Sequence, residues 1–183
     1  MDMITEKDLI VLFDEETIQK GISDLGSKLN EIYKDEEIYL ICVLKGAVMF
    51  AVDLSKHLKM PLKMEFIRLS SYGSGFTSTG KVNAVDISLP DLNNKNVLII
   101  EDIIDTGHTA KFLMDFIKFN FNTKSLKFCS LMNKEIKREV EINPDYYVFD
   151  IDDKFLVGYG LDYDGYYRNI PYIGYVKNCN NIN

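Results

Sequence analysis

Residues 97–110, VLIIEDIIDTGHTA, have the pattern of a buried strand that leads through a turn into a helix. Four consecutive aliphatic residues, 97–100, are typical of a strand that is buried on both faces. The turn from Asp105 to Thr109 then leads into a run with helical spacing, Ala110 to Phe119. Gly107 permits a close backbone approach, and the free N–H groups of a turn and a helix start bind anions. We therefore expect a terminal phosphate to bind at this turn, helped by the hydroxyls of Thr106 and Thr109.

Two carboxylates stand at the end of the same strand. Glu101 and Asp102 can accept hydrogen bonds from the vicinal hydroxyls of a sugar, directly or through a metal ion. Alternatively, these two residues simply end a strand at solvent, and Asp105 simply caps the following helix. Both features together favour a ribose-phosphate site. The chain has neither GxxxxGK followed by Ser or Thr nor GxGxxG at the start of a βαβ unit, which disfavours NTPase and dinucleotide-binding functions.

Strands and helices are predicted to alternate along the rest of the chain. An α/β fold with a central parallel sheet flanked by helices follows, with ligand-binding loops at the carboxyl ends of the strands. The predicted strands are Ile38–Leu44, Lys63–Leu69, Lys81–Ile87, Asn96–Asp102 and Leu126–Met132. The predicted helices are Ala47–Leu58, Ala110–Phe119 and a first one with the apolar stripe Ile18, Ile22, Leu25, Leu29 and Ile32. The loops expected at the site are Lys45-Gly46, Ser70–Gly80, Glu101–Thr109 and Asn133-Lys134.

The bulk properties predict one domain, residues 1–183. A chain of 183 residues that is 46% hydrophobic can bury one sizeable core. After Pro144 the sequence becomes dense in Tyr, Gly and Asp, which indicates a flap or small subdomain. The net charge of −7 and the dispersed basic residues argue against nucleic acid as a partner.

Cysteine usage and the N-terminal sequence favour a cytoplasmic setting. The three cysteines, Cys42, Cys129 and Cys179, are an odd number without CxxC spacing, so we expect neither a disulfide framework nor a zinc site. The first residues are acidic where a secretory signal is basic, and no apolar run reaches membrane-spanning length.

Residues 97–110 closely resemble the ribose-phosphate motif of type I phosphoribosyltransferases, and the remaining motifs are similar to the hypoxanthine-guanine branch of that family. The resemblance extends from Leu40 to Val176, because several motifs occur in the family's order. Besides VLIIEDIIDTGHT, they are VLKGAVMF, LSSYGSG, SLMNK and DKFLVGYGLDYDGYYRNIPYIG.

The resemblance implies an activity. In that family a purine base attacks C1 of phosphoribosyl pyrophosphate (PRPP), giving a nucleoside monophosphate and pyrophosphate with Mg²⁺ present. Asp105 matches the acid near purine N7, which acts as general base or stabilises the departing proton. Glu101 and Asp102 match the carboxylates that contact the ribose. The cradle for the 5′-phosphate matches Asp105, Thr106, Gly107, His108 and Thr109, with His108 standing where some relatives have lysine.

The resemblance also assigns a purine site. Lys134 matches a lysine that donates to the exocyclic O6, which selects 6-oxopurines over adenine; alone, it would be interpreted as a solvated lysine. Phe155 matches an aromatic residue that stacks on the purine, and the Leu156 backbone matches a contact to its pyrimidine edge. Residues from about 145 to 183 match a hood over this base site.

The leaving group and the metal are implied in the same way. Lys45 and Gly46 match a pyrophosphate-binding loop whose first peptide is often cis, and Arg168 matches a pyrophosphate ligand. Asp162 matches a Mg²⁺ contact, and the acidic pair at the ribose is the other candidate for the metal. Ser71 and Tyr72 match the start of a loop that closes over the site and excludes water.

Two alternatives remain open at this point. One is a phosphoribosyltransferase that prefers xanthine, because the sequence does not rank hypoxanthine, guanine and xanthine. The other is a regulatory relative that senses nucleotides without catalysis, which the intact Asp105 and the acidic net charge disfavour. Family members are commonly dimers or tetramers, so we expect a homodimer or homotetramer.

Overall fold

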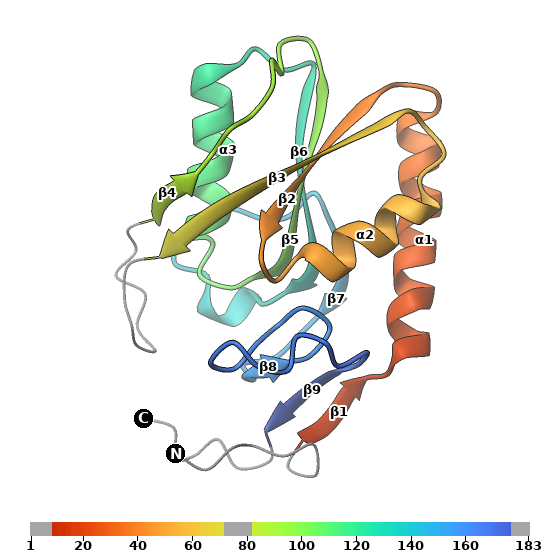
Figure 1. The fold of residues 1–183 in the computed structure, drawn as a ribbon, viewed down its shortest axis with the longest axis vertical. Coiled ribbons are helices and arrows are strands. Elements are labelled where there is room, and N and C mark those ends of the chain that lie inside the picture. The colour runs from red at the N-terminus through yellow and green to blue at the C-terminus, as the bar shows by residue number, and fades with distance from the viewer. Residues whose placement is uncertain (1–8, 72–81, 177–183) are drawn as a thin grey trace.

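A six-stranded sheet forms the centre of the computed structural model, which describes residues 9–71 and 82–176 (Figure 1). The strand order is β4-β3-β2-β5-β6-β7. All neighbouring strands are parallel except for the antiparallel β4 at one edge. The strands are β2 (Ile38–Leu44), β3 (Leu62–Ser71), β4 (Val82–Asp86), β5 (Asn96–Ile104), β6 (Ser125–Asn133) and β7 (Tyr146–Asp150). The predicted parallel sheet is confirmed.

Three helices cover the two faces of this sheet. On one face, α1 (Glu15–Tyr33) and α2 (Val48–His57) pack against Leu98 and Ile100 of β5. On the other face, α3 (His108–Asn120) packs against Val97 and Ile99 of the same strand. Because successive side chains of a strand point to opposite faces, the uninterrupted apolar run serves both cores.

The first helix differs from its predicted stripe in one position. Ile32 is 48% exposed, whereas the neighbouring Tyr33 is buried. The last two buried apolar residues of the helix are Leu29 and Tyr33, which are four residues apart. The earlier buried positions of the stripe are Ile18, Ile22 and Leu25. The prediction was therefore wrong for Ile32, because two helical spacings were equally compatible with the sequence.

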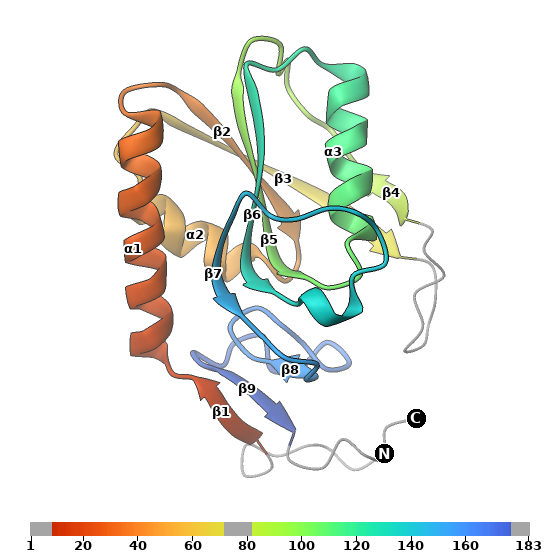
Figure 2. The ribbon, with the colours of Figure 1, turned by 180° about the vertical axis from the view of Figure 1, so that it is seen from behind.

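A second, antiparallel sheet lies beyond the carboxyl ends of the large one (Figures 1 and 2). Its order is β1-β9-β8, with β1 (Leu9–Phe13), β8 (Leu156–Val157) and β9 (Ile173–Val176). The sequence reasoning did not assign β1, which pairs along β9 and enters α1 directly. The rings of Phe13 and Phe149 stack with their centroids 4.1 Å apart, which packs the small sheet against β7. We call β1, β8, β9 and the intervening residues 158–172 the hood.

The expectation that the chain from about residue 145 belongs to the hood needs one correction. Residues Tyr146–Asp150 form β7, which pairs in parallel with β6 as the edge strand of the large sheet. The C-terminal part of the hood therefore begins after Asp150. A half-exposed edge strand of five residues has too weak a pattern to be distinguished from a loop by periodicity.

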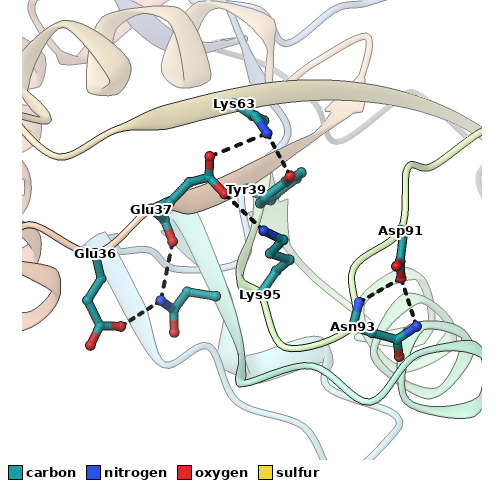
Figure 3. Close-up of polar contacts among 8 residues, drawn as sticks. Glu36, Glu37, Tyr39, Lys63, Asp91, Asn93 and Lys95 are labelled. Atoms are coloured by element: carbon teal, nitrogen blue, oxygen red, sulfur yellow. Dashed lines mark hydrogen bonds and ion pairs between the residues drawn. The ribbon is translucent and has the colours of Figure 1, made fainter.

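Charged side chains connect the amino ends of the central strands (Figure 3). Glu37, just before β2, forms ion pairs of 3.3 Å with both Lys63 and Lys95. The two ammonium groups lie over the ring of Tyr39, at 5.0 and 5.6 Å from its centroid. Asn96 donates to Glu36 at 2.8 Å. These contacts stabilise the edge of the sheet that lies opposite the hood.

Within residues 9–71 and 82–176, no helix is long and apolar enough to cross a membrane.

Candidate active site

The carboxyl ends of β2, β5 and β6 carry the predicted site loops, and they meet where the direction of the strand order reverses. The chain runs from β2 to β3 on one side and from β5 to β6 and β7 on the other. Ligands in open α/β sheets bind at such a switch point. The hood stands over the same edge (Figure 2).

The turn after β5 forms a small pocket at the start of α3. This pocket holds about 80 Å³ and is lined by Glu101, Ile103–Gly107, Thr109 and Ala110. Gly107 is the N-cap of α3 and has a φ of 88°, a backbone conformation that favours glycine. Asp105 therefore does not cap this helix. The first N–H groups of a helix lack intrahelical acceptors, so this pocket can bind an anion.

A larger pocket adjoins it. It holds about 230 Å³, and its lining includes Glu101 and Thr109, which it shares with the smaller pocket. Val43, Leu44, Gly46, Leu69, Asp102, Asp162 and Arg168 complete the lining. Glu101 and Thr109 therefore lie where the two pockets meet, and Asp102 faces the larger pocket alone.

Both carboxylates of the pair have perturbed pKa values. Burial raises the pKa of Glu101 well above its ordinary value, and the charge of Asp102 raises it further. Burial also raises the pKa of Asp102 to about 6, although the Ile103 N–H donates to its Oδ1 at 3.0 Å and the Arg168 charge acts in the opposite direction. Keeping both of these neighbouring carboxylates ionised destabilises the folded protein when no ligand is bound. Acids with such perturbed pKa values cluster at functional sites.

Glycine is required where the loop after β2 meets this pair. A Cβ atom on Gly46 would lie 1.7 Å from Asp102 Oδ2. A Cβ atom on Gly160 of the hood would lie 2.0 Å from the carbonyl oxygen of Gly46. The loop is thus layered between the hood and β5. The peptide bond between Leu44 and Lys45 is cis.

The hood supplies an ion pair to the larger pocket. Arg168 Nη2 lies 2.6 Å from Asp162 Oδ1, and Arg168 Nη1 donates to the Gly160 carbonyl at 2.6 Å. The other oxygen of Asp162 accepts from the Gly165 N–H at 2.7 Å. These bonds hold one cationic and one anionic group at the wall of the same pocket.

Lys134 lies beside Asp105 at the end of β6. Its side chain is only 6% exposed, and its Nζ is 3.6 Å from Asp105 Oδ2 and 2.8 Å from Asp153 Oδ1. Lys137 reaches the same oxygen of Asp153 at 2.9 Å. Asp105 Oδ1 is shut away from solvent and has no hydrogen-bond partner in the described part of the chain. The Asp105 side chain as a whole is 39% exposed, so the rest of the carboxylate can be reached by a ligand and can accept a proton.

The two predicted purine contacts Phe155 and Leu156 differ in exposure. Phe155 is 38% exposed, and its ring meets that of Tyr163 edge-on, with centroids 5.7 Å apart. Leu156 is buried in β8.

Two predicted residues, Lys45 and His108, do not line either pocket. The Lys45 side chain is exposed, and its neighbours Leu44 and Gly46 line the larger pocket. His108 turns away, and its Nε2 lies 2.7 Å from Glu139 Oε2. Ser71 is the last residue of β3, and Tyr72 lies outside the described residues.

The sequence reasoning missed Asp153, the nearest acid to the Lys134 ammonium group. Its position directly before Lys154 and Phe155 in the DKF motif was the available signal. Only the fold shows that it faces the end of β6.

Three comparisons with known proteins show what this chain is similar to. Residues 12–164 match the model of the phosphoribosyl transferase domain family. A hypoxanthine-guanine phosphoribosyltransferase of Streptococcus thermophilus is 41% identical over 173 residues, covering 94% of this chain and 96% of that protein. The protein of that name from Bacillus subtilis is 42% identical over 167 residues, covering 91% and 92%. A crystal structure of a hypoxanthine phosphoribosyltransferase from Staphylococcus aureus superposes with a TM-score of 0.89 at 39% identity, over 97% and 96% of the two chains.

Proposed function

The chain belongs to the phosphoribosyl transferase family, and we propose that it transfers the 5-phosphoribosyl group of PRPP to hypoxanthine or guanine. It is a purine salvage enzyme of the hypoxanthine-guanine type. The products are the nucleoside monophosphate and pyrophosphate.

The observation that carries this function is the grouping of two pockets and an acidic pair around the end of β5. The smaller pocket at α3 takes the 5′-phosphate, and the larger pocket beside Arg168 takes the pyrophosphate. Glu101 lines both pockets and Asp102 lines the larger one, so the pair can supply acceptors to the ribose hydroxyls. Lys134 and Phe155 mark the base side.

The reaction follows from this grouping. Purine N9 attacks C1 of PRPP, the bond from C1 to the pyrophosphate oxygen breaks, and its electron pair leaves with pyrophosphate. The imidazole ring of the purine then loses a proton, which Asp105 accepts. The ion pair between Asp162 and Arg168 places a guanidinium group at the developing charge of the leaving group.

Lys134 selects the base by donating to the exocyclic O6 of a 6-oxopurine. Adenine offers an amino group at that position, and a buried ammonium facing a donor would lose its partner. Asp153 and Asp105 hold the ammonium group on the side where the base binds.

Mg²⁺ fits the larger pocket as an ion shared with the substrate. Across the described residues, no group of three or more His, Cys, Asp or Glu side chains could hold a metal ion alone. Mg²⁺ usually takes one or two carboxylates together with substrate phosphates, and Asp102, Asp162 and Glu101 in the lining of this pocket would supply them. When bound there, the ion would neutralise charge on pyrophosphate.

The test is an assay of hypoxanthine, guanine and xanthine with PRPP and Mg²⁺, with adenine as the negative control. We expect turnover of hypoxanthine or guanine. Asp105→Asn should lose at least about 100-fold in kcat, the usual scale of general base catalysis, while the exposed α3 variant Asp115→Asn retains activity. Efficient use of adenine would refute the role of Lys134. No turnover of any base would refute the enzymatic function.

We further propose that the enzyme is a homodimer or homotetramer and works in the cytoplasm. Apolar side chains remain exposed on α2 and β3: Met49 at 38%, Val52 at 39% and Phe66 at 46%. Phe66 shares its sheet face with the core under α2, so a second copy of the chain could bury all three. Light scattering should show that Val52→Lys lowers the mass of the assembly and that Phe119→Lys, at the far end of α3, does not.

A further inference from the structure

Arg138 lies behind the turn that forms the smaller pocket, and nothing in the sequence pattern singled it out. It follows the short 3-10 helix at Glu135–Lys137, which Figure 2 shows near the start of α3. Its Nε donates to the carbonyl of Asp105 at 3.0 Å, and its Nη2 donates to the carbonyl of Ile104 at 3.4 Å. One guanidinium group thus binds two successive carbonyls of the turn.

The backbone around Arg138 binds the adjacent carbonyls. The Glu139 N–H donates to Thr106 O at 2.9 Å, and the Lys134 N–H donates to Ile104 O at 3.0 Å. The carbonyls of residues 104–106 are therefore all bound by the segment 134–139. A turn whose carbonyls are fixed on one side keeps its N–H groups available on the other, which is how backbone anion sites are built.

The contact between this segment and the turn is close. A Cβ atom on Gly107 would lie 2.9 Å from Arg138 Cδ and 2.8 Å from Ile142 Cγ2. Arg138 Nη1 also donates to the Ile142 carbonyl, so the same guanidinium group binds the chain four residues further on.

Arg138 also reaches the strand end that carries the purine-binding lysine. Its Nη2 donates to Asn133 Oδ1 at 2.9 Å, directly before Lys134. Asn133 in turn donates to Asp150 at 2.9 Å. The guanidinium therefore connects the ends of β5 and β6, which lie beneath the phosphate and base subsites.

We propose that Arg138 is a positioning residue for the 5′-phosphate, which holds the turn at residues 104–107 open for the anion. It acts through the backbone of the turn. The inference rests on the proposed function, because it takes the smaller pocket as the 5′-phosphate site. Lysine could replace the charge of Arg138 but not its fork of donors, since one ammonium group cannot reach these separate carbonyls together.

The test compares inosine monophosphate (IMP) with inosine, which lacks the phosphate. Their dissociation constants are measured by calorimetry for the parent, Arg138→Met, Arg138→Lys and the control Lys118→Met, which removes an exposed charge from the last turn of α3. We expect Arg138→Met to weaken IMP binding at least tenfold and inosine binding less than threefold. KM for PRPP should rise at least fivefold, with less than a twofold change in KM for the base. Arg138→Lys should recover little of the loss, and the control should match the parent.

Two outcomes overturn the proposal. One is an unchanged preference for IMP over inosine in a folded Arg138→Met protein. The other is full recovery by Arg138→Lys, which would show that charge alone matters. If Arg138→Met does not fold, the test rests on Arg138→Lys. Dissociation constants for IMP and inosine equal to those of the parent would then show that the separate donors of the guanidinium group are not needed. A parent that prefers IMP but forms no nucleotide from PRPP refutes the proposed function and leaves this test intact.

Discussion

Asp102→Asn should stabilise the metal-free protein at pH 8 while damaging its function. Burial raises the pKa of Asp102 to about 6, against an ordinary value of 3.8. Keeping this carboxylate ionised in the folded state at pH 8 therefore costs about 3 kcal/mol, since one pKa unit corresponds to about 1.4 kcal/mol. Asp102 keeps some exposure, so we expect a gain of about 1–3 kcal/mol when the charge is removed. The asparagine Oδ1 can still accept from the Ile103 N–H.

The pH dependence gives the sharper test. The folded state holds the proton of Asp102 up to about pH 6, whereas the unfolded chain releases it near pH 3.8. Between these values the folded state binds more protons, so the wild-type protein loses stability as pH rises. The advantage of Asp102→Asn should therefore fall to about half at pH 5 and vanish below pH 4.

The assay is urea unfolding at pH 8 and pH 5 in the presence of EDTA. Asp115→Asn, on the exposed face of α3, is the matched control and should stay within about 0.5 kcal/mol of wild type at both values. KM for PRPP should rise in Asp102→Asn. A variant that is less stable than wild type at pH 8, or an advantage that grows on acidification, would refute the argument from burial.

Two further changes probe the packing around the site. Tyr159→Phe removes the hydroxyl that donates to Asp53 Oδ2 at 2.6 Å. The free energy of unfolding in urea should fall by only about 1–2 kcal/mol, because Asp53 keeps two other donors. An unchanged free energy of unfolding would show that this hydrogen bond between the hood and α2 is unimportant. Gly107→Ala places a Cβ at a φ of 88° and within 3 Å of Arg138 and Ile142, and should cost about 2–4 kcal/mol and weaken IMP binding. Wild-type unfolding and binding of that variant would contradict the close fit behind the turn.

Much of the fold could be predicted because periodicity reports burial. The uninterrupted apolar runs that form β2 and β5 are confirmed as strands covered on both faces. The helices α2 and α3 lie within two residues of their predicted bounds. Four strands escaped this reasoning, since β1, β8 and β9 have at most five residues each and β7 is an edge strand that is only partly buried.

The site divides in the same way. The amino-acid sequence by itself determined the acidic pair, the glycine turn and the loops that follow the strands, because these are local features of the chain. Only the tertiary structure decided that Asp105 does not cap α3, that Asp153 pairs with Lys134 and that Arg138 binds the turn from behind. The contacts of Asp153 and Arg138 join residues that are distant along the chain, so their distances depend on how β5, β6 and the segments that follow them pack. The groups proposed to contact the substrate can therefore be predicted from the sequence. The groups that position them, such as Asp153 and Arg138, can be identified only from the packing.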